Sequence, residues 1–270
     1  MIKKSIWYSL FTIATVSLVI LAIGFYQAVM ATTGGSPQTP QQSPSAQIAG
    51  TQAKLPSKHS NLFQVFILGD SIAKGTGDEN GKGFAGYLPE LLKNDTPKKI
   101  VVTDAGIDGL ESQGLLEELQ NKRLDKAISG SDLILISIGG NDLKSILTLN
   151  DLSKEEAFNT RQTNYLANLK HTFKILRTYN PNALIVFLGL YNPFEKETTA
   201  EDVGLLNEWN YNTQQLLDSD SNTIFIPTFD LMKYNLGRYL AKDGLHPNSA
   251  GYQAISGRIS KSVEMIVSSL

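Results

Sequence analysis

The stretch Phe63-Gln64-Val65-Phe66-Ile67-Leu68-Gly69-Asp70-Ser71-Ile72 contains a short apolar run that ends at a glycine. Such a run, bounded by a turn residue, is typical of a buried strand. Four later runs repeat the pattern: Ile100–Thr103, Leu133–Ile138, Ala183–Leu188 and Thr223–Ile226. We therefore expect five buried strands.

The segments between these runs have the apolar spacing of amphipathic helices. They are Phe84–Asn94, Ser112–Ile128, Ser153–Tyr179, Ala200–Asp218 and a last helix after Pro247, whose apolar face is Tyr252, Ile255, Ile259, Val263 and Ile266. Apolar strands that alternate with such helices predict a parallel sheet covered on both faces. The expected fold is a three-layer α/β/α domain with a central parallel five-stranded sheet.

Polar residues follow the first three predicted strands. Asp70-Ser71 comes after the first, Gly106 after the second and Asn141-Asp142 after the third. In open parallel sheets the functional crevice lies beyond the carboxyl ends of the strands. These residues are therefore expected to be neighbours.

Ser71, Asp243 and His246 have the chemistry of a nucleophile, an orienting acid and a base. A serine needs a base to accept its proton, and an imidazole needs a carboxylate to fix its tautomer. Asp243 and His246 are three residues apart in a turn with a glycine, so both side chains can point the same way. Taken singly, Ser71 also fits a helix N-cap and His246 a helix-entry residue before Pro247.

Acyl transfer also needs hydrogen-bond donors for the oxygen that becomes negative. Gly106 offers a backbone N–H and Asn141 an amide side chain, both at predicted strand ends. Each also fits an ordinary turn position.

Four blocks of the sequence together resemble the GDSL-type or SGNH hydrolases. They are Gly69-Asp70-Ser71-Ile72, Gly106, Gly139-Gly140-Asn141-Asp142 and Asp243-Gly244-Leu245-His246-Pro247, in the order of the family's Ser, Gly, Asn and His blocks. The resemblance covers about Phe63 to Leu270. It implies a flavodoxin-like fold and a serine esterase with a Ser71–His246–Asp243 triad. It further implies an oxyanion hole formed by the Ser71 and Gly106 N–H groups and the Asn141 side chain.

Composition excludes several other functions. With 24 Lys+Arg against 26 Asp+Glu and a net charge of −2, the chain lacks the basic surface that nucleic-acid binding needs. It has no cysteine, which removes disulfides and thiol nucleophiles, and only the histidines His59, His171 and His246. We expect neither a metal nor a cofactor.

The N-terminal residues are predicted to lie outside the hydrolase domain. Residues 1–31 carry Lys3 and Lys4 before a long apolar run, which predicts a membrane anchor with its N-terminus in the cytoplasm. A cleaved secretory signal is the alternative. Residues 32–60 are rich in Pro, Ser and Gln and predict a flexible linker. The hydrolase domain, 61–270, is then expected outside the membrane, where it cleaves lipid or acetylated-glycan esters.

A different function class stays open at this point. The domain could be a catalytically silent, membrane-tethered module that binds a cell-envelope ligand, because a fold alone does not imply activity. The complete set of nucleophile, base, acid and oxyanion donors favours the enzyme.

Overall fold

The structure is a computed structural model that describes Ile23 and residues 61–147, 151–194 and 197–269. Apart from Ile23, the predicted anchor or signal segment, 1–31, and the linker, 32–60, lie outside the described residues. Within the described part of the chain, no helix is both long enough and apolar enough to cross a membrane.

Five strands form one parallel sheet in the order β2-β1-β3-β4-β5. Their bounds are β1 Leu62–Gly69, β2 Lys99–Gly106, β3 Leu133–Ser137, β4 Leu184–Leu188 and β5 Thr223–Ile226. The predicted parallel five-stranded sheet is confirmed. This strand order is the flavodoxin-like one, in which the chain reverses its direction of travel across the sheet between β1 and β3.

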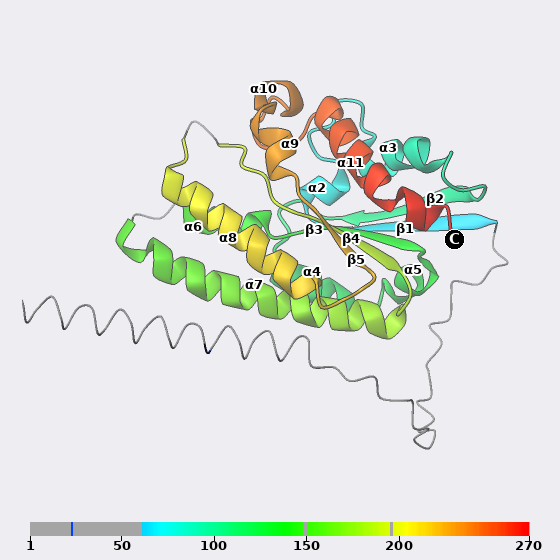
Figure 1. The fold of residues 1–270 in the computed structure, drawn as a ribbon, viewed down its shortest axis with the longest axis horizontal. Coiled ribbons are helices and arrows are strands. Elements are labelled where there is room, and N and C mark those ends of the chain that lie inside the picture. Colours follow the sequence, from blue (N-terminus) through cyan, green and yellow to red (C-terminus); the bar gives the residue numbers. More distant parts are fainter. Residues whose placement is uncertain (1–22, 24–60, 148–150, 195–196, 270) are drawn as a thin grey trace, which may run out of the picture. The chain divides into compact units, whose positions relative to one another are not determined.

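Helices fill the connections between the strands and follow the last strand (Figure 1). Their bounds are α2 Ser71–Lys74, α3 Gly83–Leu92, α4 Ser112–Gln120, α5 Asp125–Gly130, α6 Gly140–Leu147, α7 Asp151–Tyr179, α8 Ala200–Leu217, α9 Phe229–Lys233, α10 Leu236–Tyr239 and α11 Ser249–Val267.

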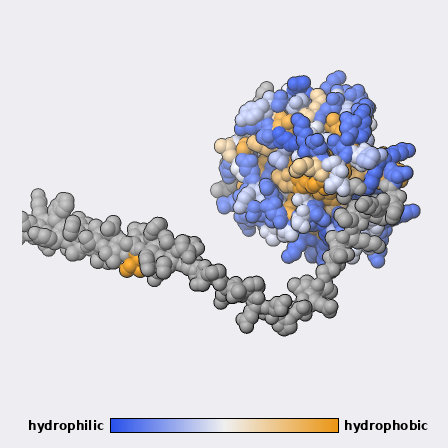
Figure 2. Space-filling model, turned by 45° about the vertical axis from the view of Figure 1, so that its right-hand side comes forward, coloured by the Kyte–Doolittle hydropathy of each residue, from blue (hydrophilic) through white to orange (hydrophobic). Residues whose placement is uncertain are grey.

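The two faces of the sheet carry separate apolar cores. Strand β1 sends Phe63, Val65 and Ile67 to the face covered by α3 and α11, and Phe66 and Leu68 to the face covered by α4, α7 and α8 (Figure 1). This alternation follows from the two-residue period of a strand. The surface is mostly hydrophilic in the view of Figure 2, with apolar side chains limited to a smaller area.

The prediction that all five strands are buried was wrong for two of them. Strand β2 has only exposed and half-buried residues, with Val101 38% exposed, and three of the four residues of β5 are half-buried. Both are edge strands of the sheet, which have a neighbour on one side only.

Two helix predictions also need correction. The single helix expected over Ser112–Ile128 is broken into α4 and α5, and Lys122 between them has φ +58°, which no α-helix accommodates. In α11, Ile266 is 38% exposed and Val267 takes its place in the core.

The carboxyl ends of β1, β2 and β3 lie side by side. Gly69 at the end of β1 is in register with Gly106 on β2 and with Ser137 on β3. The segments that follow these three ends therefore meet at the point where the strand order reverses, which is where ligands bind in sheets of this kind.

Candidate active site

The strand-to-helix turn after β1 presents Ser71. Asp70 is the N-cap of α2, and its Oδ1 accepts the Ile72 N–H at 3.0 Å. Gly69 has φ +131°, and a Cβ at this position would lie 1.8 Å from the carbonyl oxygen of Ser137. Only glycine fits such a close approach. Ser71 is the first residue of α2. Its own N–H therefore has no acceptor within the helix.

A second loop, before α11, presents Asp243 and His246. One carboxylate oxygen of Asp243, Oδ1, accepts the backbone N–H groups of Leu245 at 2.9 Å and His246 at 3.0 Å. Gly77, at φ +94°, packs so closely on this loop that a Cβ there would lie 2.6 Å from Cβ of His246. The loop thus holds both side chains on the same side of the chain.

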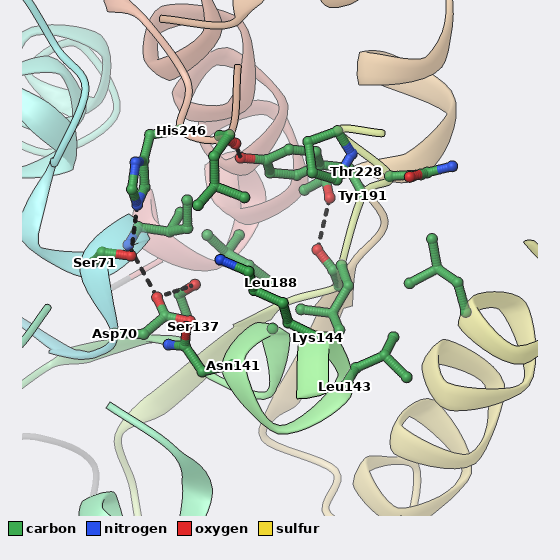
Figure 3. A pocket seen from close by; sticks show the side chains of 18 of the residues that line it. Asp70, Ser71, Ser137, Asn141, Leu143, Lys144, Leu188, Tyr191, Thr228 and His246 are labelled. Atoms are coloured by element: carbon green, nitrogen blue, oxygen red, sulfur yellow. Dashed lines mark hydrogen bonds between the residues drawn. The ribbon is translucent and has the colours of Figure 1, made fainter. Parts of the chain in front are cut away.

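The structure brings Ser71, His246 and Asp243 into one hydrogen-bonded row. Figure 3 shows the contact between Ser71 and His246. Nδ1 of His246 lies 2.7 Å from Oδ2 of Asp243, and Nε2 lies 2.9 Å from Oγ of Ser71. Because a carboxylate only accepts hydrogen bonds, Nδ1 carries the hydrogen and Nε2 is left to accept the proton of the Ser71 hydroxyl. This arrangement can activate a serine.

The electrostatics of the two carboxylates differ. Partial burial acts to raise the pKa of Asp243, but the hydrogen bonds from the His246 ring and from two backbone N–H groups outweigh it and lower the pKa to about 2. Asp243 is thus ionised at neutral pH and can stabilise a protonated His246. Burial raises the pKa of Asp70 to about 6, against the hydrogen bonds from Ser137 and the backbone.

The predicted oxyanion donors are not placed equally. Asn141 is the second residue of α6 and lines the cleft beside Ser71. Its Nδ2 donates one hydrogen to the carbonyl oxygen of Leu110 at 2.9 Å, which leaves the other amide hydrogen unused. The N–H of Gly106 donates to Oδ1 of Asp104 at 2.8 Å, and Gly106 does not line the cleft. Of these two residues, only Asn141 has a donor beside the nucleophile.

Asp142, the neighbour of Asn141, points away from the nucleophile. Its carboxylate accepts the Ser112 N–H at 3.0 Å and the Ser112 hydroxyl at 2.6 Å, and it is only 3% exposed. This buried contact ties α6 to α4. It helps to fix the orientation of α6, and so the position of Asn141.

A cleft that is open to solvent lies next to Ser71 and His246 (Figure 3). Much of its lining is apolar: Ile72, Leu143, Leu188, Leu190, Tyr191, Pro193, Phe194, Leu206, Leu245 and Ile255. A lining of this kind fits an apolar part of a small molecule.

Several residues of the site were not predicted from the sequence. Ser137, on β3, donates its hydroxyl hydrogen to Asp70 at 3.0 Å, and Tyr191, after β4, donates to the carbonyl oxygen of Leu245 at 2.6 Å. Lys144 of α6 also lines the cleft. A continuous apolar run marks β3, but nothing in the sequence indicates which distant loop each side chain meets.

The remaining histidines have other places. His171 is exposed on α7, and His59 lies outside the described residues. In the described ranges, no group of three or more His, Asp or Glu side chains is arranged to hold a metal ion.

Comparison with known proteins identifies the family of this chain. Residues 67–254 match the GDSL-like lipase/acylhydrolase family. The chain belongs to this family and is a carboxylic ester hydrolase.

Among curated proteins, the spore germination lipase LipC of Bacillus licheniformis is 28% identical over 203 residues, which are 73% of this chain and 94% of LipC. Among solved structures, the lipase Lip_vut3 from a goat rumen metagenome is 24% identical with a TM-score of 0.65, over 74% of this chain and 97% of that one. A variant of the acetyl xylan esterase Axe2 from Geobacillus stearothermophilus is 19% identical with a TM-score of 0.57, over 74% and 94%. The two structures share the fold with this chain.

Proposed function

We propose that the protein is a serine esterase in which Ser71 is the nucleophile, His246 the base and Asp243 the orienting acid. The hydrogen-bonded row from Ser71 Oγ through the imidazole to Asp243 carries this proposal. As Oγ attacks the ester carbonyl carbon, its proton passes to Nε2 of His246, and Asp243 stabilises the imidazolium. The proton then goes to the departing alcohol when the ester C–O bond breaks.

The second half of the reaction repeats these roles. Water gives a proton to His246 and attacks the acyl-Ser71 carbonyl, and the bond to Oγ breaks as Ser71 takes the proton back. In both halves the carbonyl oxygen becomes negative. The Ser71 N–H and the remaining Asn141 amide hydrogen are the donors we assign to it, since both lie beside the nucleophile.

The substrate we favour is an ester of an apolar acyl group, of the lipid type. The cleft beside Ser71 is lined mainly by aliphatic and aromatic side chains. LipC and Lip_vut3 are named as lipases, and Axe2 as an acetyl xylan esterase. Apolar lining favours the first kind of substrate over an acetylated glycan.

The enzyme acts, in this proposal, outside the cell membrane. The sequence of residues 1–31 supports an anchor, or a cleaved signal as the alternative, and 32–60 supports a tether. The silent binding module gains no support from the site, since Ser71 is hydrogen-bonded to a base that is itself oriented by a carboxylate.

Hydrolysis of 4-nitrophenyl butyrate by purified variants tests the proposal. Ser71→Ala and His246→Ala should each lower kcat by about 10⁴-fold or more, and Asp243→Asn by less, because members of such a unit fail together. The controls are Ser129→Ala on α5 and His171→Ala on α7, both exposed and away from the cleft. Substantial activity in correctly folded Ser71→Ala protein would refute the mechanism.

A further inference from the structure

Lys144 places a positive charge in the cleft that the ester hydrolysis described above does not use. It lies on α6, three residues after Asn141, and residues at this spacing share one face of a helix. Both residues line the cleft. Figure 3 shows the Lys144 side chain extending along the cleft on the side of Ser71 and Leu188.

The charge of Lys144 is not neutralised by the described part of the protein. Other lysines are paired: Lys74 with Asp108, Lys82 with Glu90 at 3.1 Å and Lys154 with Asp202 at 2.9 Å. Among the described residues, Lys144 forms no such ion pair.

The other charged or titratable groups in the cleft are already engaged. Asp70, which is 3% exposed, accepts hydrogen bonds from Ile72 and Ser137, and His246 is held by Asp243. The nearest acidic neighbour on α6, Asp142, is turned towards Ser112. Lys144 is thus available to a ligand.

Lys144 is exposed to solvent at the apolar cleft. Leu143 and Leu188 line the same cleft, so a bound substrate would displace water near the ammonium group and lower the local dielectric constant. A charge-assisted hydrogen bond formed there is stronger than one between neutral groups. One turn of helix separates Lys144 from Asn141, roughly 5–6 Å between Cβ atoms, so an anion bound by Lys144 lies a few atoms from the ester carbonyl.

We propose that Lys144 is a specificity-determining residue that binds an anionic group, a carboxylate or a phosphate, of the ester substrate. This inference rests on the proposed function of Ser71. The anion belongs either to the alcohol part or to the acyl part of the ester, and both sources present the same chemistry to the lysine.

Two matched substrate pairs distinguish the sources. For the alcohol side, 1-octanoylglycerol 3-phosphate is compared with 1-octanoylglycerol, since both release octanoate. For the acyl side, the 4-nitrophenyl monoester of glutaric acid is compared with 4-nitrophenyl pentanoate. The full-length chain is used in neutral detergent, and the measured quantity is the ratio of kcat/KM for the anionic ester to that for the neutral one.

Lys144→Met keeps the apolar stem and removes the charge. We expect it to lower the anionic-to-neutral ratio about tenfold in one of the two pairs, and Lys144→Arg to restore most of the ratio. Lys170→Met, which removes an exposed charge from α7 outside the cleft, should leave both ratios unchanged. If both ratios stay the same in Lys144→Met, the inference is overturned while the esterase mechanism stands.

A binding measurement separates the inference from turnover. The ether analogue 1-octylglycerol 3-phosphate is titrated into Ser71→Ala protein and into the Ser71→Ala, Lys144→Met double variant by calorimetry. We expect the loss of Lys144 to raise the Kd about tenfold for the ligand that carries its anion on the recognised side of the ester. The glutarate monoamide of butylamine serves as the acyl-side ligand. If the double variant binds each of the two ligands with the same Kd as the Ser71→Ala protein, the inference is contradicted, whether or not any ester is cleaved.

Discussion

Asn141 has one amide hydrogen in use and one to spare. Because Nδ2 donates to the carbonyl oxygen of Leu110 at 2.9 Å, the side chain has a fixed direction beside Ser71. If the second hydrogen binds the developing oxyanion, Asn141→Ala should lower kcat by about 10²–10³ with little change in KM. Kinetics and thermal unfolding are measured on the same purified variant.

The same substitution removes a structural hydrogen bond, so a control is needed. Asn212→Ala on α8 removes a comparable contact, the one from Asn212 to Gln162 at 2.8 Å, and should lower Tm slightly without lowering kcat. A fall in Tm for Asn141→Ala with an unchanged kcat would show that Asn141 stabilises its turn and has no catalytic role.

At this scale the sequence predicted the residues that act together but not those that hold them. Ser71 was predicted from its position after the first strand, and Asp243 and His246 from their spacing in a turn. The structure brings the three within hydrogen-bond distance. Ser137 and Tyr191 contact loops 67 and 54 residues away in the sequence. No periodic pattern in the sequence indicates such long-range contacts.

At the scale of elements, Gly106 has a packing role beside the oxyanion role predicted for it. A Cβ at Gly106 would lie 2.2 Å from the backbone nitrogen of Lys74 and 2.5 Å from its Cα. The glycine thus lets β2 and α2, the helix that begins with Ser71, pack in direct contact. Its N–H is bound to Asp104.

Gly106→Ala should therefore push α2 away from the sheet and displace the nucleophile. We expect a lower Tm and a fall in kcat/KM of about 10²-fold, since a small misplacement of a reacting group is costly. Gly257→Ala on α11, where a Cβ would meet nothing within 4 Å, should keep full activity and gain some stability. A Gly106→Ala protein with native Tm and activity would show that the contact is not needed.

Element types were predictable where the periodicity is long and strong. All five strands and the long helices α7, α8 and α11 lie where the apolar pattern placed them. The short helices α9 and α10, of five and four residues, are too short to have a visible period. Strand β2 is exposed because it lies at the edge of the sheet. This depends on the strand order, which cannot be predicted from composition.

At the scale of the whole molecule, the prediction concerns the side of the membrane. Lys3 and Lys4 before an apolar segment favour a cytoplasmic N-terminus and an external domain. Protease added to intact cells should cut between about Thr32 and Lys58 and release a soluble, active fragment, while a cytoplasmic marker stays intact. Protection of the chain until the cells are lysed would contradict this topology.

The domain order remains a prediction from composition, because residues 1–22 and 24–60 lie outside the described part. The three-layer domain was predictable because alternating apolar strands and amphipathic helices have few ways to bury both kinds of surface. The cleft was not predictable from the sequence. Its walls come from β4, α6, α8 and the loop before α11, which meet only in the folded chain.

Covalent labelling of Ser71 tests the central claim most directly. A fluorophosphonate reacts when the serine oxygen attacks phosphorus and fluoride leaves, a reaction that needs an activated hydroxyl. Mass spectrometry of the labelled, digested protein should find the phosphonyl group on Ser71, and His246→Ala should abolish the label while Ser129→Ala keeps it. A folded wild-type protein that stays unlabelled, or that is labelled at another serine, would contradict the account.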